Sequence, residues 1–126
     1  MTVPFPAIAS ILSPEALIDK ILPGFAVGEV AECRFYTGGF NHTYQVKTKD
    51  ARTYYLRAYR QPWRTWADIQ YELDVLNYLK GQGFPAVQPL PYRDEKYFCS
   101  VAAPEGRRYL ALFTEAPGPE IAYTHD

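Results

Sequence analysis

The chain has 126 residues, of which 48% are hydrophobic and 16% aromatic, a composition typical of one packed domain and not of a disordered segment. The formal net charge of −1, with acidic and basic residues interleaved, speaks against a basic surface for nucleic acid. No apolar run approaches the ~20 residues of a membrane-spanning helix, and the N-terminus lacks the positive start of a signal peptide. We therefore predict a cytoplasmic protein that binds neither nucleic acid nor a membrane.

The first part of the chain predicts a short helix and then three strands. Ser13 suits the cap of that helix and Pro14 its first position. Runs with strand chemistry follow at residues 32–37, 43–48 and 52–59. Their connections are short, which favours an antiparallel meander.

The second part predicts one long helix and two further strands. Ile69, Leu73 and Leu76 recur at helical spacing within residues 65–80, and Gly81 suits the end of that helix. A proline-rich connector at residues 83–91 leads to expected strands at 97–102 and 108–113. The predicted fold class is α+β: a five-stranded antiparallel sheet with a packed helix, preceded by a short helix.

The two cysteines, Cys33 and Cys99, lie far apart in strand-like runs. We expect them to be reduced core residues, with a disulfide or a metal site as the alternative. Two cysteines and two histidines without ligand spacing give no zinc signal, so we predict no metal ligands in this chain.

Three features point to a ligand site. Gly38 and Gly39 stand between two predicted strands, where glycine lets the backbone approach a ligand, although a hairpin turn has the same pattern. Arg57 lies on the third strand, in phase with two tyrosines, and is either a phosphate partner or a surface residue. Glu72 falls within the apolar stripe of the long helix. A carboxylate there needs a partner, for which Arg57 is the candidate, unless it reaches water at the rim.

These residues resemble the N-terminal lobe of the aminoglycoside phosphotransferase and choline kinase superfamily, which has a protein-kinase-like fold. The likeness rests on a glycine-rich loop and strand at 38–46, a strand with a cation at 55–60, a helix with an acid at 68–72, a hairpin at 103–107 and a hinge at 112–118. It implies an ATP-dependent phosphotransferase that acts on a small-molecule hydroxyl. It also implies a lobe over residues 1–117 and a linker from 118–126 toward a second lobe.

The resemblance further implies roles for individual residues. Gly38, Gly39 and Asn41 would cover the phosphates of ATP, and Arg57 would contact them while Glu72 orients it. The backbone of Phe113, Thr114, Glu115 and Ala116 would hold adenine.

The family's catalytic loop, His-Gly-Asp followed by Asn, and its later magnesium-binding Asp have no counterpart in the sequence. Mg²⁺ and the small-molecule phosphate acceptor are therefore expected only with a C-terminal lobe, and this chain alone is predicted inactive. The alternative is a non-catalytic, pseudokinase-like binding module. A missing lobe would leave an exposed apolar face near Phe113.

Overall fold

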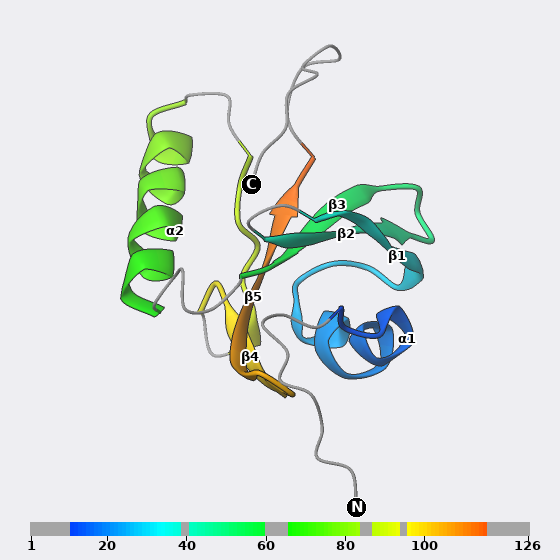
Figure 1. Cartoon of the computed structure of the whole chain (residues 1–126). Coiled ribbons are helices and arrows are strands. Elements are labelled where there is room, and N and C mark those ends of the chain that lie inside the picture. Colours follow the sequence, from blue (N-terminus) through cyan, green and yellow to red (C-terminus); the bar gives the residue numbers. More distant parts are fainter. Residues whose placement is uncertain (1–10, 39–40, 60–65, 84–86, 94–95, 116–126) are drawn as a thin grey trace, which may run out of the picture.

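A computed structural model describes residues 11–38, 41–59, 66–83, 87–93 and 96–115. Within these ranges the chain forms a five-stranded sheet of order β1-β2-β3-β5-β4, in which all neighbours are antiparallel. The strands are β1 (Val30–Gly38), β2 (His42–Thr48), β3 (Thr53–Ala58), β4 (Cys99–Ala103) and β5 (Gly106–Thr114). The predicted fold class and the expected meander of the first three strands are confirmed (Figure 1).

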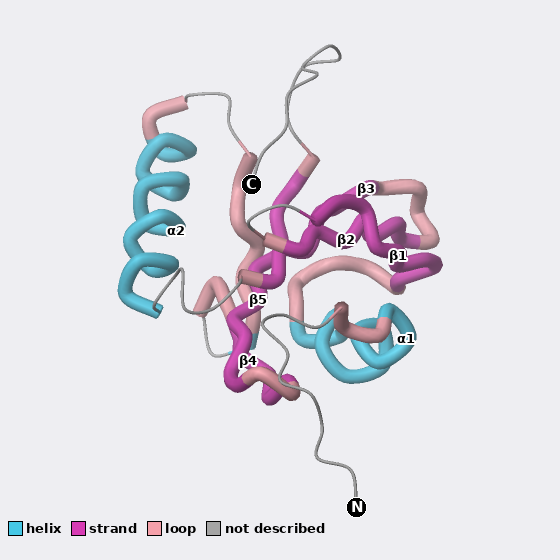
Figure 2. The backbone as a smooth tube through the Cα atoms, in the orientation of Figure 1, coloured by secondary structure: helices cyan, strands magenta, loops and turns pink. Residues whose placement is uncertain are grey.

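Helical segments lie on two sides of the strands (Figure 2). The first is α1 (Pro14–Ala16), which continues as a π-helical turn over Leu17–Ile21 and a 3-10 turn over Leu22–Gly24. The predicted cap is confirmed, because the Ser13 hydroxyl oxygen accepts a hydrogen bond from the Ala16 amide at 3.3 Å. The second helix is α2 (Trp66–Gly81), close to the predicted 65–80.

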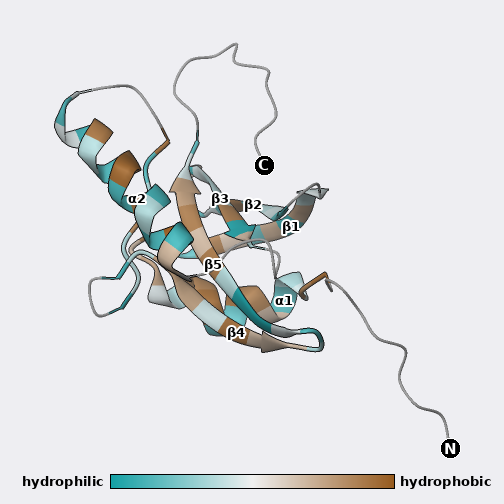
Figure 3. Ribbon diagram, turned by 60° about the vertical axis from the view of Figure 1, so that its left-hand side comes forward, coloured by the Kyte–Doolittle hydropathy of each residue, from teal (hydrophilic) through white to brown (hydrophobic). Residues whose placement is uncertain are grey.

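Two apolar clusters cover opposite faces of the sheet, because successive side chains of a strand point to opposite faces. Leu110 and Leu112 of β5 belong to the cluster that includes Leu17 and Leu22 of the α1 segment. Ala111 and Phe113 of the same strand belong to the cluster with Ile69 and Leu73 of α2. Apolar residues accordingly colour much of β5, whereas α2 alternates between apolar and polar residues (Figure 3).

The connector after α2 extends the sheet in a way that the sequence did not indicate. Pro89 forms an isolated bridge with Phe113, and the Leu90 amide donates to Leu112 O at 2.9 Å. The connector therefore takes over where the pairing of β4 with β5 stops at Leu110. The expectation of an exposed apolar face is wrong at Phe113 itself, which is 3% exposed because α2 and the connector cover it. The linker from residue 116 on lies outside the described residues.

Cys33 and Cys99 lie on β1 and β4, the two outer strands of the sheet, and both are reduced. Burial raises the pKa of the Cys33 thiol to about 11 and that of Cys99 to about 12. Among the described residues, no group of three or more His, Cys, Asp or Glu side chains could hold a metal ion. No helix within the described ranges is long and apolar enough to cross a membrane.

Candidate functional site

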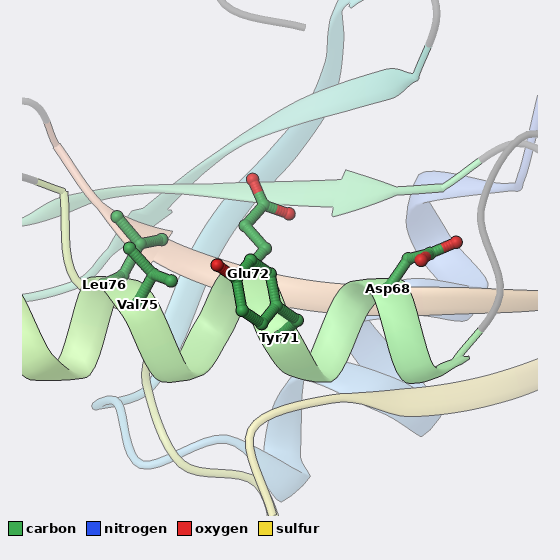
Figure 4. Close-up of a pocket in the computed structure, with 5 residues that line it drawn as sticks. All are labelled: Asp68, Tyr71, Glu72, Val75 and Leu76. Atoms are coloured by element: carbon green, nitrogen blue, oxygen red, sulfur yellow. The ribbon is translucent and has the colours of Figure 1, made fainter.

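Arg57 of β3 and Glu72 of α2 form an ion pair, as the helical phase of Glu72 predicted. Arg57 Nη1 lies 3.0 Å from Glu72 Oε2, and the two side chains are 15% and 30% exposed. Figure 4 shows the Glu72 side chain rising from α2 toward β3. The helix and the centre of the sheet therefore meet through one partly buried pair of opposite charges.

Tyr59 completes this pair as a third member. Its hydroxyl donates to Glu72 Oε1 at 2.9 Å and accepts from Arg57 Nη1 at 3.3 Å. The tyrosine is fully buried, and that burial raises the pKa of its hydroxyl well above the ordinary value. The hydroxyl stays protonated and can keep donating to the carboxylate. Sequence reasoning had placed Tyr59 in phase with Arg57 but gave it no role.

The Arg57 guanidinium also lies against aromatic rings. Its Cζ is 4.6 Å from the ring centroid of Phe113 and 5.5 Å from that of Tyr59. Burial alone would lower the pKa of Arg57, but the nearby Tyr59 and Glu72 outweigh it and leave the pKa raised. Phe113 thus contributes a side chain to the site, whereas the sequence had suggested only its backbone.

Arg57 has donors left over for a further ligand. Both of its hydrogen bonds within the described ranges use Nη1. The N–H groups on Nε and Nη2 form none with the residues that the structure describes. A guanidinium with two unused donor positions, held in place from behind by a carboxylate, can bind an anion in a fork.

The glycine loop joins β1 to β2, and β2 pairs with β3 at Arg57. In the sheet register, Thr43 of β2 pairs with Arg57 and His42 pairs with both Gly38 and Ala58. Gly38 ends β1, and Asn41 is 3% exposed directly before β2. Gly39 lies outside the described residues. The loop therefore leaves the sheet one residue pair beyond Arg57.

The predicted adenine segment has part of its backbone already engaged. The Thr114 amide donates to Gln88 O at 3.0 Å, and the Gln88 amide donates to the Thr114 hydroxyl at 2.9 Å. Glu115 is exposed, and Ala116 lies outside the described residues. A nucleobase at this end of β5 would have to meet the backbone next to Thr114 and not its amide.

A hollow of about 540 Å³ opens beside the ion pair. The described residues that line it all come from α2: Asp68, Tyr71, Glu72, Val75 and Leu76 (Figure 4). Glu72 belongs both to the hollow and to the ion pair, so the hollow lies against the α2 member of the pair.

Comparison with known proteins gives relatives along nearly the whole chain. This chain is 40% identical over 114 residues to an uncharacterized protein of Synechocystis sp., and the match covers 90% of this chain and 31% of that protein. It is 36% identical over 120 residues to an uncharacterized protein of Deinococcus radiodurans, and this match covers 95% of this chain and 34% of that protein. The chain thus spans about a third of the length of these relatives.

Two solved kinases share the fold. A microcompartment-associated aminopropanol kinase superposes with a TM-score of 0.67 at 24% identity, over 85% of this chain and 33% of the kinase. The amicoumacin kinase hAmiN, solved with AMP-PNP, Ca²⁺ and Ami, superposes with a TM-score of 0.69 at 20% identity, over 85% and 32%. Residues 32–122 match the family model of the phosphotransferase enzyme family. The predicted resemblance is confirmed, and the chain belongs to the phosphotransferase enzyme family.

Proposed function

We propose that this chain is the nucleotide-binding part of an ATP-dependent phosphotransferase that acts on the hydroxyl group of a small molecule. The observation that carries the proposal is the Arg57–Glu72 pair, in which the carboxylate holds the guanidinium by Nη1, while Nε and Nη2 bond to none of the residues that the structure describes and could bind an anion. The family membership and the kinases of like fold support it.

The residues present fit the phosphates of ATP. The Arg57 side chain is only 15% exposed, so contact with a phosphate would take place largely away from water, where a charge-assisted hydrogen bond is strong. Glu72 and Tyr59 restrict the rotation of the guanidinium before ATP arrives. The ligand would therefore meet a cation that is already oriented.

The glycine loop and the end of β5 complete the proposed site. Gly38, Gly39 and Asn41 would lie over the phosphates, because the loop begins one residue pair from Arg57 in the sheet. Backbone from Phe113 to Ala116 would hold adenine, since Phe113 pairs with Tyr55 two residues before Arg57. In this arrangement adenine and phosphates would follow the direction of β3.

The chain's residues would bind and orient the nucleotide, while ATP supplies the phosphoryl group. Phosphoryl transfer also needs metal ions and a residue that positions the nucleophile. The sequence has no His-Gly-Asp loop for that task, so the 126-residue chain by itself is expected to bind ATP without turnover. Mg²⁺ and the acceptor would be held by a further lobe.

The test uses the protein as its gene encodes it. ATP affinity is measured by calorimetry, and phosphate transfer is measured with a panel of amino alcohols and aminoglycosides. Arg57→Met is expected to weaken ATP binding, whereas Arg52→Met, an exposed arginine just before β3, should leave it unchanged. ATP binding without transfer to any acceptor would favour the alternative, a non-catalytic binding module. Absence of ATP binding would contradict both.

A further inference from the structure

The least expected side chain in the structure is Arg108 of β5, a cation that is fully buried. Its Nε donates to Tyr59 O at 2.7 Å, its Nη2 to Ala58 O at 3.0 Å and its Nη1 to Glu105 Oε2 at 3.1 Å. An arginine can meet such a set because its donors form a rigid planar fork. The guanidinium therefore joins the end of β3 to the turn before β5.

The partner of Arg108 is held equally far from water. The Glu105 side chain is 4% exposed and stands three residues before Arg108. Gly106, between them, has φ +128°, a conformation that side-chain-bearing residues rarely adopt. A buried ion pair is retained only at a large desolvation penalty, which calls for a reason beyond packing.

Arg108 and the side chain of Tyr59 lie on opposite faces of the sheet. Arg108 is in phase with Leu110 and Leu112, which pack against the α1 segment. The Tyr59 ring belongs to the cluster with Ile69 of α2. Arg108 thus donates to the backbone carbonyl of Tyr59 on one face, while the Tyr59 hydroxyl bonds to Glu72 and Arg57 on the other.

Tyr59 needs such support because β3 ends one residue earlier, at Ala58. Beyond that point its backbone is held by the bond of its amide to Tyr109 O at 2.8 Å and by the bond of its carbonyl to Arg108. A shift of this backbone would move the hydroxyl that contacts both members of the Arg57–Glu72 pair. The backbone that carries this hydroxyl is therefore bonded to a guanidinium on the opposite face.

We propose that Arg108, together with Glu105, is a positioning residue for the Arg57–Glu72 pair and acts on it through Tyr59. Its effect on ATP binding rests on the function proposed above, but its effect on the geometry of the pair does not. The two can therefore be tested separately.

The first test measures ATP affinity in the encoded protein by calorimetry. Arg108→Lys keeps the charge but replaces the fork by one ammonium group, so the dissociation constant should rise about tenfold, as expected for one charge-assisted hydrogen bond lost at Arg57. The matched control is Arg107→Lys, an exposed neighbour on the same strand, which should leave the constant unchanged. In a Tyr59→Phe background, Arg108→Lys should add less than about twofold, because the link through the hydroxyl is already missing.

The second test needs no nucleotide. The Arg57 Nε–H resonance, assigned with Arg57→Lys, reports the orientation of the guanidinium over the Phe113 ring 4.6 Å away. The resonance should shift in Arg108→Lys but not in Arg107→Lys. Glu105→Gln is the milder variant to use if Arg108→Lys folds poorly, and it should shift the resonance too. A shift in a protein that binds no ATP would keep this inference and reject the proposed function. An unshifted resonance in a folded Arg108→Lys or Glu105→Gln protein would overturn the inference, as would fully additive losses of ATP affinity in the Tyr59→Phe background.

Discussion

Replacing Arg57 alone or Glu72 alone should destabilise the protein, and the two single losses should sum to more than the loss in the double variant. Replacing Glu72 by Met leaves the Arg57 guanidinium, 15% exposed, without its counter-charge. Replacing Arg57 by Met leaves a carboxylate that is 30% exposed and can turn toward water. Glu72→Met is therefore the more harmful single change.

The magnitudes follow from how far the pair is buried. Breaking a fully buried ion pair costs about 3–5 kcal/mol, so at these exposures we expect about 2–3 kcal/mol for Glu72→Met and ~1–2 kcal/mol for Arg57→Met. The double variant places two apolar side chains together and should lose about 1 kcal/mol. The sum of the two single losses minus the loss in the double variant then gives a coupling free energy of about 3 kcal/mol, well above the ~0.5 kcal/mol by which independent sites depart from additivity.

Urea denaturation of the four proteins measures this coupling, provided that the slope of unfolding stays constant. The matched control is the pair of Lys49 and Glu29, whose atoms lie 2.8 Å apart but whose side chains are 62% and 72% exposed. Its cycle should show no coupling outside error, because water and salt screen exposed charges. Additive effects at Arg57 and Glu72 would refute the claim that they act as a unit.

Three further outcomes are expected. Tyr59→Phe removes the hydroxyl that donates to Glu72 and should lower the free energy of unfolding by about 1–2 kcal/mol in urea denaturation; an unchanged midpoint would contradict that bond. Gly106→Ala, at φ +128°, should lower the thermal unfolding temperature and cost ~1–3 kcal/mol, whereas Gly81→Ala, with nothing within 4 Å of the added carbon, should not. The Cys33 thiol has its pKa raised by burial from 9.0 to about 11, so the stability linked to it is complete below pH 9 and is lost as the pH rises through 11. Stability against urea across that range should fall less in Cys33→Ala, and an equal fall would reject this assignment.

Much of the sheet could be predicted because local patterns and tertiary packing agree. Tyr44 and Val46 alternate with polar residues along β2, and both are fully buried. Short connections fixed the antiparallel order of the first three strands. The helical phase of Glu72 indicated a partner across the sheet, and Arg57 was the cation in range.

The parts that were missed depend on contacts between distant segments. Arg108 is in phase with Leu110 and Leu112, which was a signal of burial, but an arginine on a strand is usually exposed. Its acceptors, the carbonyls of Ala58 and Tyr59, carry no sequence signal at all. The burial of Phe113 was missed for the same reason, because the connector that bridges it looked like an irregular linker.

The most direct test of the central claim compares the affinities for ATP and adenosine in the unsubstituted protein and in Arg57→Met. If Arg57 binds phosphate, the substitution should weaken ATP binding by about ten- to a hundredfold, as expected for charge-assisted hydrogen bonds, and leave adenosine binding unchanged. If the ratio of the adenosine and ATP dissociation constants is the same in both proteins, the account is contradicted.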